Sequence, residues 1–375
     1  MYFLDARFLA LAPLVLVVYW LSGSARNHVL LAASVGWLCV FSPSTLLALS
    51  GMSLGVVLPV ARAAARAREA GRPGRAGAIG WLGIAALLAI AIALRLPSYF
   101  LPDRALSATL LGDPILHWIG FSYFLLKCIH VMRGSARGIV AAPGALQLLH
   151  YVLFVPTLTS GPIYRLDTFV TQLEAPRQLS WDGVHDGLVR CLIGIAKKVV
   201  LVPTLAAIVS PLSARGLAGK PLAFAALYVL LYFDFSGYTD VAIGLGRLLG
   251  FQVPENFKKP FTSTTLTQFW RNWHATLGDW IRENVFIPLG GLRAEGAKLS
   301  AIVLGSMLLV GLWHRFTLVF IGWGAYHGAL LLLENWLGVK PLRPYRTPWW
   351  QLWLRYALIQ AAAAGGMFAF MDWVS

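Results

Sequence analysis

The sequence predicts an all-α integral membrane protein with about ten transmembrane helices, a re-entrant segment and interfacial helices. Two observations support this prediction. Hydrophobic residues make up 58% of the chain and charged residues only 13%, whereas a soluble domain has about 25% charged residues. In addition, apolar stretches near the ~20 residues that a helix needs to cross a bilayer recur from one end of the chain to the other. We therefore expect a single membrane-embedded domain over residues 1–375.

This domain divides into N-terminal helices in residues 1–138, a core with the sequence motifs in residues 139–338, and a C-terminal helix in residues 339–375. The first apolar run follows Asp5 and Arg7, and the segment "LSGSARN" after it is a poor cleavage site, so we expect a retained span and not a signal peptide. The spans are expected at 8–22, 29–43, 44–61, 78–94, 108–126, 199–213, 221–238, 299–313, 316–333 and 352–372.

Membrane topology explains the formal charge of +15 without a nucleic-acid partner. Basic residues mark the cytoplasmic loops of membrane proteins, where they meet anionic lipid headgroups. If the N-terminus lies outside, the basic clusters at 62–75, 127–137 and 258–298 all face the cytoplasm. The external loops then hold only Arg95, Arg104, Arg215 and Lys220. The opposite orientation would reverse nearly every cluster, so we expect the first one.

Two segments in the middle of the chain depart from the pattern of simple spans. Residues 139–163 are apolar but are broken by three prolines and Gly161, which predicts a re-entrant pair or a broken helix covered by other protein. Residues 166–198 mix acidic and basic residues, as interfacial helices do. The sequence shows no internal repeat, which disfavours a transporter, and its cysteines have no spacing typical of a metal site or a disulfide framework.

Ionisable residues inside a membrane are functional candidates, because each costs at least ~2.5 kcal/mol at the bilayer centre. Asp234 and Asp240 lie near the end of an apolar helix in "LYFDFSGYTDVAIGLGRLLGF". On a helix they point about 120° apart, so they are not expected to act as one paired acid. The simplest interpretation is that they cap the helix or pair with Arg247 or Lys258.

The segment "FWRNWHATLGDWIRENVFIPLGG", residues 269–291, concentrates polar and aromatic residues between apolar runs. As a helix it would place His274 and Arg271 on one face and its tryptophans, Trp273 among them, at the membrane interface. Asp279 and Arg282 follow on the same segment. An aromatic belt explains the tryptophans but does not explain His274 as readily.

A third candidate region is "LLVGLWHRFTLVFIGWGAYHGALLLLENW". His314 interrupts two apolar runs with no carboxylate nearby in sequence. A buried imidazole is neutral and can accept a proton from a hydroxyl group, so His314 is either a core histidine or a general base. His327 is a weaker candidate. The sequence has no phosphate-binding glycine loop, no nucleophilic serine elbow and no spacing of residues typical of metal ligands.

The motifs "PTLTSGPIYRL", "YFDFSGYTDVAIGLGRLLGF", "PENFKKPF", "FWRNWHATLGDWIRENVFIPLGG", "GLWH" and "WGAYHG" occur in an order that resembles the membrane-bound O-acyltransferases. The resemblance is greatest to the bacterial branch that acts in alginate O-acetylation and teichoic acid D-alanylation. The matching blocks run from about 156 to 331, and the N-terminal helices match only in hydropathy.

This resemblance implies a multi-pass protein of the bacterial cytoplasmic (inner) membrane. It would move an acetyl or D-alanyl group from a cytoplasmic thioester, either acetyl-CoA or an acyl carrier protein, to hydroxyl groups of a cell-envelope or exported polysaccharide. An extracytoplasmic acyltransferase is an expected partner, and no bound cofactor or metal is required. An acidic carrier would be attracted by the basic inner face. The motifs leave open whether the group is acetyl or D-alanyl.

By the same resemblance, His314 and His274 match the catalytic histidines of the family. The other candidates for the tunnel or for donor binding are Trp273, Arg271, Asp279, Arg282, Arg315, Asp234 and Asp240. Arg315 is a departure, because the family continues "GLWH" with glycine and a small residue, where this chain has Arg315 and Phe316. Two alternatives therefore stay open: a non-enzymatic glycan flippase or transporter, and a scaffold that has lost activity.

Overall fold

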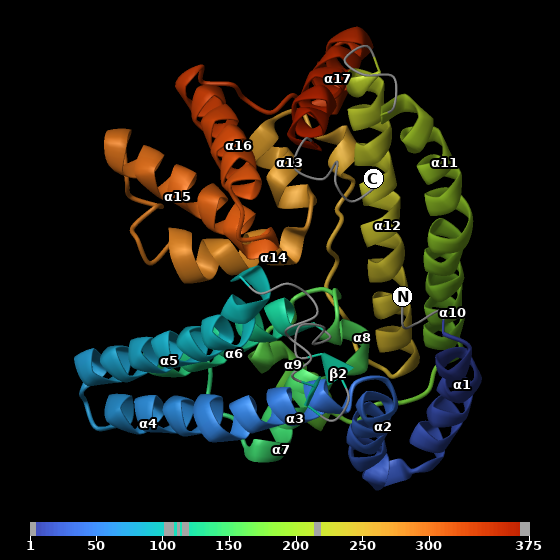
Figure 1. Cartoon of the computed structure of the whole chain (residues 1–375), viewed down its shortest axis with the longest axis vertical. Coiled ribbons are helices and arrows are strands. Elements are labelled where there is room, and N and C mark those ends of the chain that lie inside the picture. The colour runs from blue at the N-terminus through green and yellow to red at the C-terminus, as the bar shows by residue number, and fades with distance from the viewer. Residues whose placement is uncertain (1–4, 101–108, 111–112, 115–119, 214–218, 368–375) are drawn as a thin grey trace. The chain divides into compact units, whose positions relative to one another are not determined.

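The computed structural model describes residues 5–100, 109–110, 113–114, 120–213 and 219–367, and most of them are helical (Figure 1). The first part of the chain holds α1 (Ala6–Leu21), α2 (Arg26–Phe41), α3 (Pro43–Met52), α4 (Leu58–Glu69), α5 (Pro73–Phe100), α6 (Phe121–Arg137), α7 (Ala145–Leu153), α8 (Val155–Leu158) and α9 (Leu166–Glu174). The second part holds α10 (Trp181–Ala196), α11 (Val202–Ser213), α12 (Lys220–Leu248), α13 (Leu266–Asn272), α14 (Ala275–Ile281), α15 (Gly296–His314), α16 (Leu318–Trp336) and α17 (Trp349–Gly365). The prediction of an all-α membrane protein is confirmed.

Within the described residues, five helical stretches are long and apolar enough to cross a membrane. They are Pro43–Glu69, Pro73–Ala93, Trp181–Val209, Pro221–Leu248 and Gly296–His314. The apolar helix α1 is shorter than these. The count of about ten spans therefore stays a prediction. Arg104 and Arg215, which we expect in external loops, lie outside the described residues.

Two predicted elements differ from the structure. The span expected at 108–126 lies partly outside the described residues; inside them, β1 (Thr109–Leu110) pairs antiparallel with β2 (Asp113–Pro114), and α6 begins only at Phe121. Pro114 fits this difference, since proline removes a backbone donor that a helix interior needs. The second difference concerns α10, expected to lie along the membrane surface. It continues through a π-helical segment, η5 (Lys197–Leu201), into α11, so that Trp181–Val209 reads as one apolar helix.

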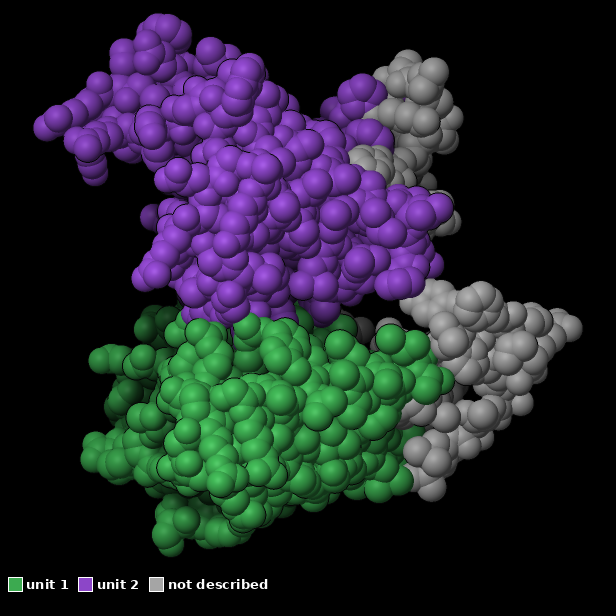
Figure 2. Space-filling model, turned by 90° about the vertical axis from the view of Figure 1, so that its left-hand side faces the viewer, with its two compact units in different colours: residues 1–191, 241–253 green, residues 192–240, 254–375 purple. Residues whose placement is uncertain are grey.

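The chain forms two compact units, coloured separately in Figure 2. Unit 1 contains residues 1–191 and 241–253, and unit 2 contains residues 192–240 and 254–375. Both α10 and α12 run from one unit into the other. The expected single domain with three parts stays a prediction.

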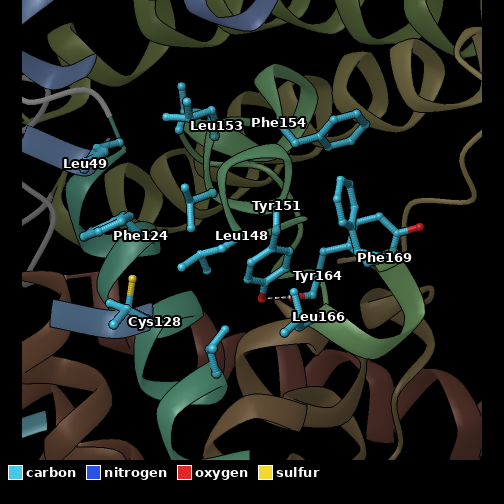
Figure 3. Packing of buried hydrophobic residues seen from close by; sticks show 14 of the residues in the cluster. Leu49, Phe124, Cys128, Leu148, Tyr151, Leu153, Phe154, Tyr164, Leu166 and Phe169 are labelled. Carbon is cyan, nitrogen blue, oxygen red and sulfur yellow. Dashed lines mark hydrogen bonds between the residues drawn. The ribbon is translucent and has the colours of Figure 1, made fainter. Parts of the chain in front are cut away.

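Unit 1 buries the broken segment that the sequence predicts in residues 139–163. Helix α7 ends before Phe154, and the short α8 starts next to Pro156. The rings of Phe154, Phe169 and Phe251 pack together, with centroids 5.0 to 5.5 Å apart. Figure 3 shows this core, in which the Tyr151 hydroxyl donates to the Tyr164 carbonyl oxygen at 2.5 Å. Protein therefore covers the break, as a non-helical backbone at membrane depth requires.

Lys127 supplies a hydrogen-bond donor at this break. Its side chain is buried, and Nζ donates to the Tyr151 carbonyl oxygen and to Thr157 Oγ1, both at 3.1 Å. In an uninterrupted helix the Tyr151 carbonyl would accept from the residue four positions later, so Lys127 replaces a bond that the break removes. Lys127 thus lies inside a helix and is buried, so it does not belong to a loop; the expected cytoplasmic side of residues 127–137 stays a prediction.

Unit 2 is held together by a second apolar core between α11, α12, α13 and α17. In this core the Trp273 ring stacks on Tyr228 and on Phe269, with centroids 5.4 and 5.6 Å apart. The Tyr228 hydroxyl donates to Gln360 Oε1 at 2.5 Å, which ties α12 to α17. Phe269 and Trp273, which belong to the motif in residues 269–291, are therefore positioned in this core.

Candidate active site

A close helix pair, α15 and α16, carries His314. Its backbones approach so closely that a Cβ atom at Gly311 would lie 2.2 Å from the Phe320 carbonyl oxygen, and one at Gly324 would lie 2.5 Å from the Met307 carbonyl oxygen. Glycine is therefore required at both positions. His314 is the last residue of α15, and Trp323 and His327 lie on α16.

The preceding motif is attached to the same pair by a buried carboxylate. Glu334, near the end of α16, accepts hydrogen bonds from the backbone N–H groups of Leu266 and Thr267 and from the Thr267 hydroxyl group. These N–H groups open α13, where they have no partner within the helix and where a negative charge is favoured. Glu334 therefore fixes the start of the segment that leads to His274.

His274 does not continue a helix, which corrects our expectation for residues 269–291. Helix α13 ends at Asn272, α14 begins at Ala275, and His274 lies between them with φ 46° and ψ 49°. This is the left-handed region, which costs a residue other than glycine about 1–3 kcal/mol when the surroundings enforce it. His274 and Arg271 are consequently not neighbours on one helical face: His274 is buried, and Arg271 is exposed.

Aromatic rings surround the His274 side chain. Phe235 contacts its ring edge to face at 4.7 Å between centroids, and Trp313 lies at 6.0 Å. Burial, and after it the proximity of His314, lower the pKa of His274 to about 3. The imidazole is therefore neutral at physiological pH, so that it has one N–H to donate and one nitrogen to accept.

His314 contacts the same tryptophan, Trp313. Its ring centroid is 4.9 Å from Trp313, 5.5 Å from Trp323 and 6.0 Å from Phe320. Unlike His274, His314 has exposed surface. The structure thus brings together the two histidines that the sequence selects, one of them buried and the other accessible, with Trp313 in contact with both.

His327 has the surroundings of a core residue. It is 2% exposed, and its ring contacts Trp270 at 4.9 Å and Trp323 at 4.8 Å. Its Nδ1 atom has no hydrogen-bond partner among the described residues. A Cβ atom at Gly366 would lie 2.3 Å from its Nε2 atom. These contacts agree with the lower rank that the sequence gives His327.

Asp234 and Asp240 form ion pairs that we did not expect. Asp240 accepts from Lys197 Nζ at 2.6 Å, and Asp234 accepts from Lys198 Nζ. Lys197 and Lys198 are consecutive, and consecutive residues of an α-helix point about 100° apart. The two lysines therefore reach two different carboxylates, and the π-helical segment η5 begins at Lys197. The predicted partners, Arg247 and Lys258, are wrong: Arg247 pairs with Asp186 at 3.5 Å.

The remaining candidate residues differ in the exposure of their side chains. Trp273 is buried in the core of unit 2 and not in an exposed belt, because its ring stacks on the rings described above. The side chains of Arg271, Asp279 and Arg282 are exposed. Arg315 is exposed directly after α15, and among the described residues it forms no ion pair.

Sequence reasoning missed three groups of residues around the site. They are Asn256, which accepts a hydrogen bond from the Thr276 hydroxyl group, Glu334, and the lysines 197 and 198. The motif "PENFKKPF" contains the signal for Asn256, because an asparagine between apolar residues needs hydrogen-bond partners when it is buried. Nothing local in sequence identifies Glu334, which acts on residues nearly seventy positions earlier.

The chain is similar to known proteins over most of its length. The family model described as "MBOAT, membrane-bound O-acyltransferase family" matches residues 107–339. "Probable alginate O-acetylase AlgI" of Pseudomonas putida is 33% identical over an alignment of 401 positions, which covers 96% of this chain and 79% of that protein.

Two further relatives are matched over shorter regions. The protein of the same description from Pseudomonas aeruginosa is 38% identical over 236 residues, which cover 60% of this chain and 44% of that protein. "Teichoic acid D-alanyltransferase" of Bacillus subtilis is 30% identical over 239 residues, which cover 59% of this chain and 60% of that protein. The matched region thus spans less than two thirds of the length of these two relatives.

Proposed function

Because the chain belongs to the membrane-bound O-acyltransferase family, we propose that it transfers an acetyl or D-alanyl group from a thioester donor on the cytoplasmic side to a hydroxyl group of a cell-envelope or exported polysaccharide. The observation that carries the proposal is the pair formed by buried His274 and exposed His314, which both contact Trp313. The acceptor class follows from relatives described as an alginate O-acetylase and a teichoic acid D-alanyltransferase.

In the proposed reaction, His314 accepts the proton of the acceptor hydroxyl group as its oxygen attacks the thioester carbonyl carbon. The C–O bond forms, and the carbonyl oxygen takes up negative charge. The neutral His274 donates one N–H to that oxygen. When the C–S bond breaks, the thiolate leaves and takes the proton from His314, which returns to its neutral form. General-base assistance of this kind contributes about 10²–10⁴ in rate.

Exposed basic side chains on the segment that contains His274 would form a docking surface for the donor. Arg271 and Arg282 lie on exposed positions of the segment that holds His274. A phosphate-bearing cofactor such as coenzyme A, or an acidic carrier protein, would be attracted to such groups. No metal or redox group enters this reaction scheme. The extracytoplasmic partner and the inner-membrane location remain part of the proposal.

The proposal is tested by measuring ester-linked acyl groups on envelope glycans of bacteria that express the chain. Mild alkali releases such groups, and mass spectrometry then quantifies acetate and D-alanine. We expect the wild type to raise one of the two and His314→Ala to abolish the increase at equal membrane levels of protein. The matched control is His185→Ala, which removes an exposed histidine of unit 1 and should leave the increase intact. An unchanged increase with His314→Ala would exclude the mechanism, and no increase with the wild type would favour a scaffold or a transporter.

A further inference from the structure

The left-handed backbone of His274 needs a cause. Among the described residues other than glycine, only Lys259 and His274 have a positive φ. Histidine adopts this conformation more readily than most residues, but still uncommonly. Such a conformation persists only where neighbouring groups hold it, and functional sites are where it is often kept. The question is which residues hold it here.

Asn256 binds the two residues that directly follow His274. Its backbone carbonyl oxygen accepts from the Ala275 N–H at 2.8 Å, and its side-chain Oδ1 accepts from the Thr276 hydroxyl at 2.5 Å. Asn256 is 0% exposed, and Thr276 is 6% exposed. Since both groups are buried, neither bond competes with water. The start of α14 is thereby tied to one side chain and one carbonyl of a preceding segment.

The same segment also binds the residues that precede His274. Phe257 and Trp273 form an antiparallel bridge, and the Lys258 N–H donates to the Asn272 carbonyl oxygen at 2.9 Å. His274 is therefore held on both sides by residues 256–258. A continuous helix through His274 would require these bonds to break, because the chain could not keep residues 272 and 275 at their present partners.

We propose that Asn256 is a positioning residue: by binding Ala275 and Thr276, it holds His274 in the left-handed conformation and so directs the His274 imidazole at the thioester carbonyl. The inference rests on the proposed function, since it assigns Asn256 a part in the same reaction. Asn256 itself touches no reacting atom. Its effect is exerted through the backbone of His274, whose ring is directed between Phe235 and Trp313.

The test removes the side-chain bond with the smallest possible change. Thr276→Val keeps the shape of the side chain but deletes the hydroxyl donor, and Asn256→Ala deletes the acceptor. Thr276→Ser keeps the hydroxyl group. Asn284→Ala is the matched control, because Asn284 is buried and, among the residues that the structure describes, its side chain donates within its own helical turn, to the Trp280 carbonyl oxygen at 3.0 Å.

The first readout is steady-state transfer in proteoliposomes with acetyl-CoA as donor. A displaced catalytic group costs up to about 100-fold in rate. We therefore expect Thr276→Val and Asn256→Ala to lower kcat by about 10- to 100-fold, with KM for acetyl-CoA changed by less than about twofold. The double variant should lose no more than Asn256→Ala, because both substitutions cut the same bond. Thr276→Ser should retain most of the rate, and Asn284→Ala should match the wild type.

The second readout does not require activity. Hydrogen exchange of the peptide around residues 270–281 should be about tenfold faster in Thr276→Val than in the wild type, while the melting temperature stays close to that of Asn284→Ala. If exchange in this peptide is unchanged, or if kcat is unchanged while His274→Ala abolishes transfer, Asn256 does not position His274 and the inference is wrong. If His274→Ala itself transfers at the wild-type rate, the proposed role of His274 is wrong and the inference is overturned with it.

Discussion

At the scale of single residues, the chain combines a buried neutral histidine with an accessible one. The sequence selects both histidines: His314 interrupts two apolar runs, where an ionisable group is costly, and an aromatic belt does not readily explain His274. The local conformation of His274 does not follow from the sequence. It depends on Asn256, eighteen positions earlier, and propensity within the segment favours one uninterrupted helix. Contacts between distant segments decide such conformations, and a single sequence does not reveal them.

Arg315 is exposed beside His314 and is always charged, so it is available to an acceptor that carries carboxylate or phosphate groups. Arg315→Gly should therefore weaken transfer to a uronate-containing oligosaccharide by about tenfold, the effect of losing ~1.4 kcal/mol of binding. Transfer to a neutral oligosaccharide should change little, and Arg315→Lys should recover part of the loss, since an ammonium group lacks the planar donor fork. Competition between the two oligosaccharides in one vesicle assay measures this. Faster transfer to both would identify the arginine as an obstruction.

At the scale of the elements, the two ion pairs between η5 and α12 explain why α12 carries two aspartates in an apolar sequence. Hydropathy predicts the helix itself, and the cost of a carboxylate in a membrane identifies the two aspartates as functional candidates. Their partners were not predicted, because neither the continuation of α10 into α11 nor the π-helical segment has a clear signal in a single sequence. Intramembrane charges of this kind are normally paired inside the bundle.

Asp240→Asn should therefore destabilise the protein. The side chains of Lys197 and Asp240 are 18% and 5% exposed, and removing one member of a buried pair costs about 3–5 kcal/mol. The double variant Lys197→Met/Asp240→Leu should recover most of the loss, because it removes both charges. Thermal unfolding in detergent measures the effect. The control is Asp186→Asn, whose exposed pair with Arg247 contributes about 0–1 kcal/mol. Equal shifts of the melting temperature for the two aspartates would contradict this account.

Lys127 predicts a dependence of stability on pH. Burial lowers its pKa to about 7, while the unfolded chain has a lysine pKa of about 10.4. Between these values the unfolded state binds more protons, so the free energy of unfolding should rise with pH, by at most ~1.4 kcal/mol per pH unit. Below pH 7 both states are protonated, and this contribution stays constant.

Lys127→Met should remove this part of the pH dependence, whereas Lys340→Met, at an exposed position, should keep it. Melting temperatures measured in detergent at pH 7, 8 and 9 compare the two variants. If the slopes of wild type and Lys127→Met coincide, Lys127 is not protonated differently in the folded and unfolded states.

At the scale of the whole molecule, the orientation in the membrane follows from the distribution of basic residues. The loop after α4 and the segment before α15 should both face the cytoplasm. In a variant without native cysteines, single cysteines at Ala70 and Ala297, both exposed, should resist membrane-impermeant thiol reagents in intact cells and react after permeabilisation. Labelling of both in intact cells would reverse the topology and place the proposed donor surface on the wrong side.

If the proposed mechanism is right, His274 and His314 act as one catalytic unit in acyl transfer. The most direct test is the transfer rate of His274→Ala, His314→Ala and the double variant in reconstituted vesicles, each with unchanged melting temperature. Each single substitution should lower the rate by about 10²-fold or more, and the double variant should lose much less than the product of the two losses, because residues that act together are not additive. A folded His314→Ala protein that transfers at nearly the wild-type rate, or losses that multiply fully, would contradict the account.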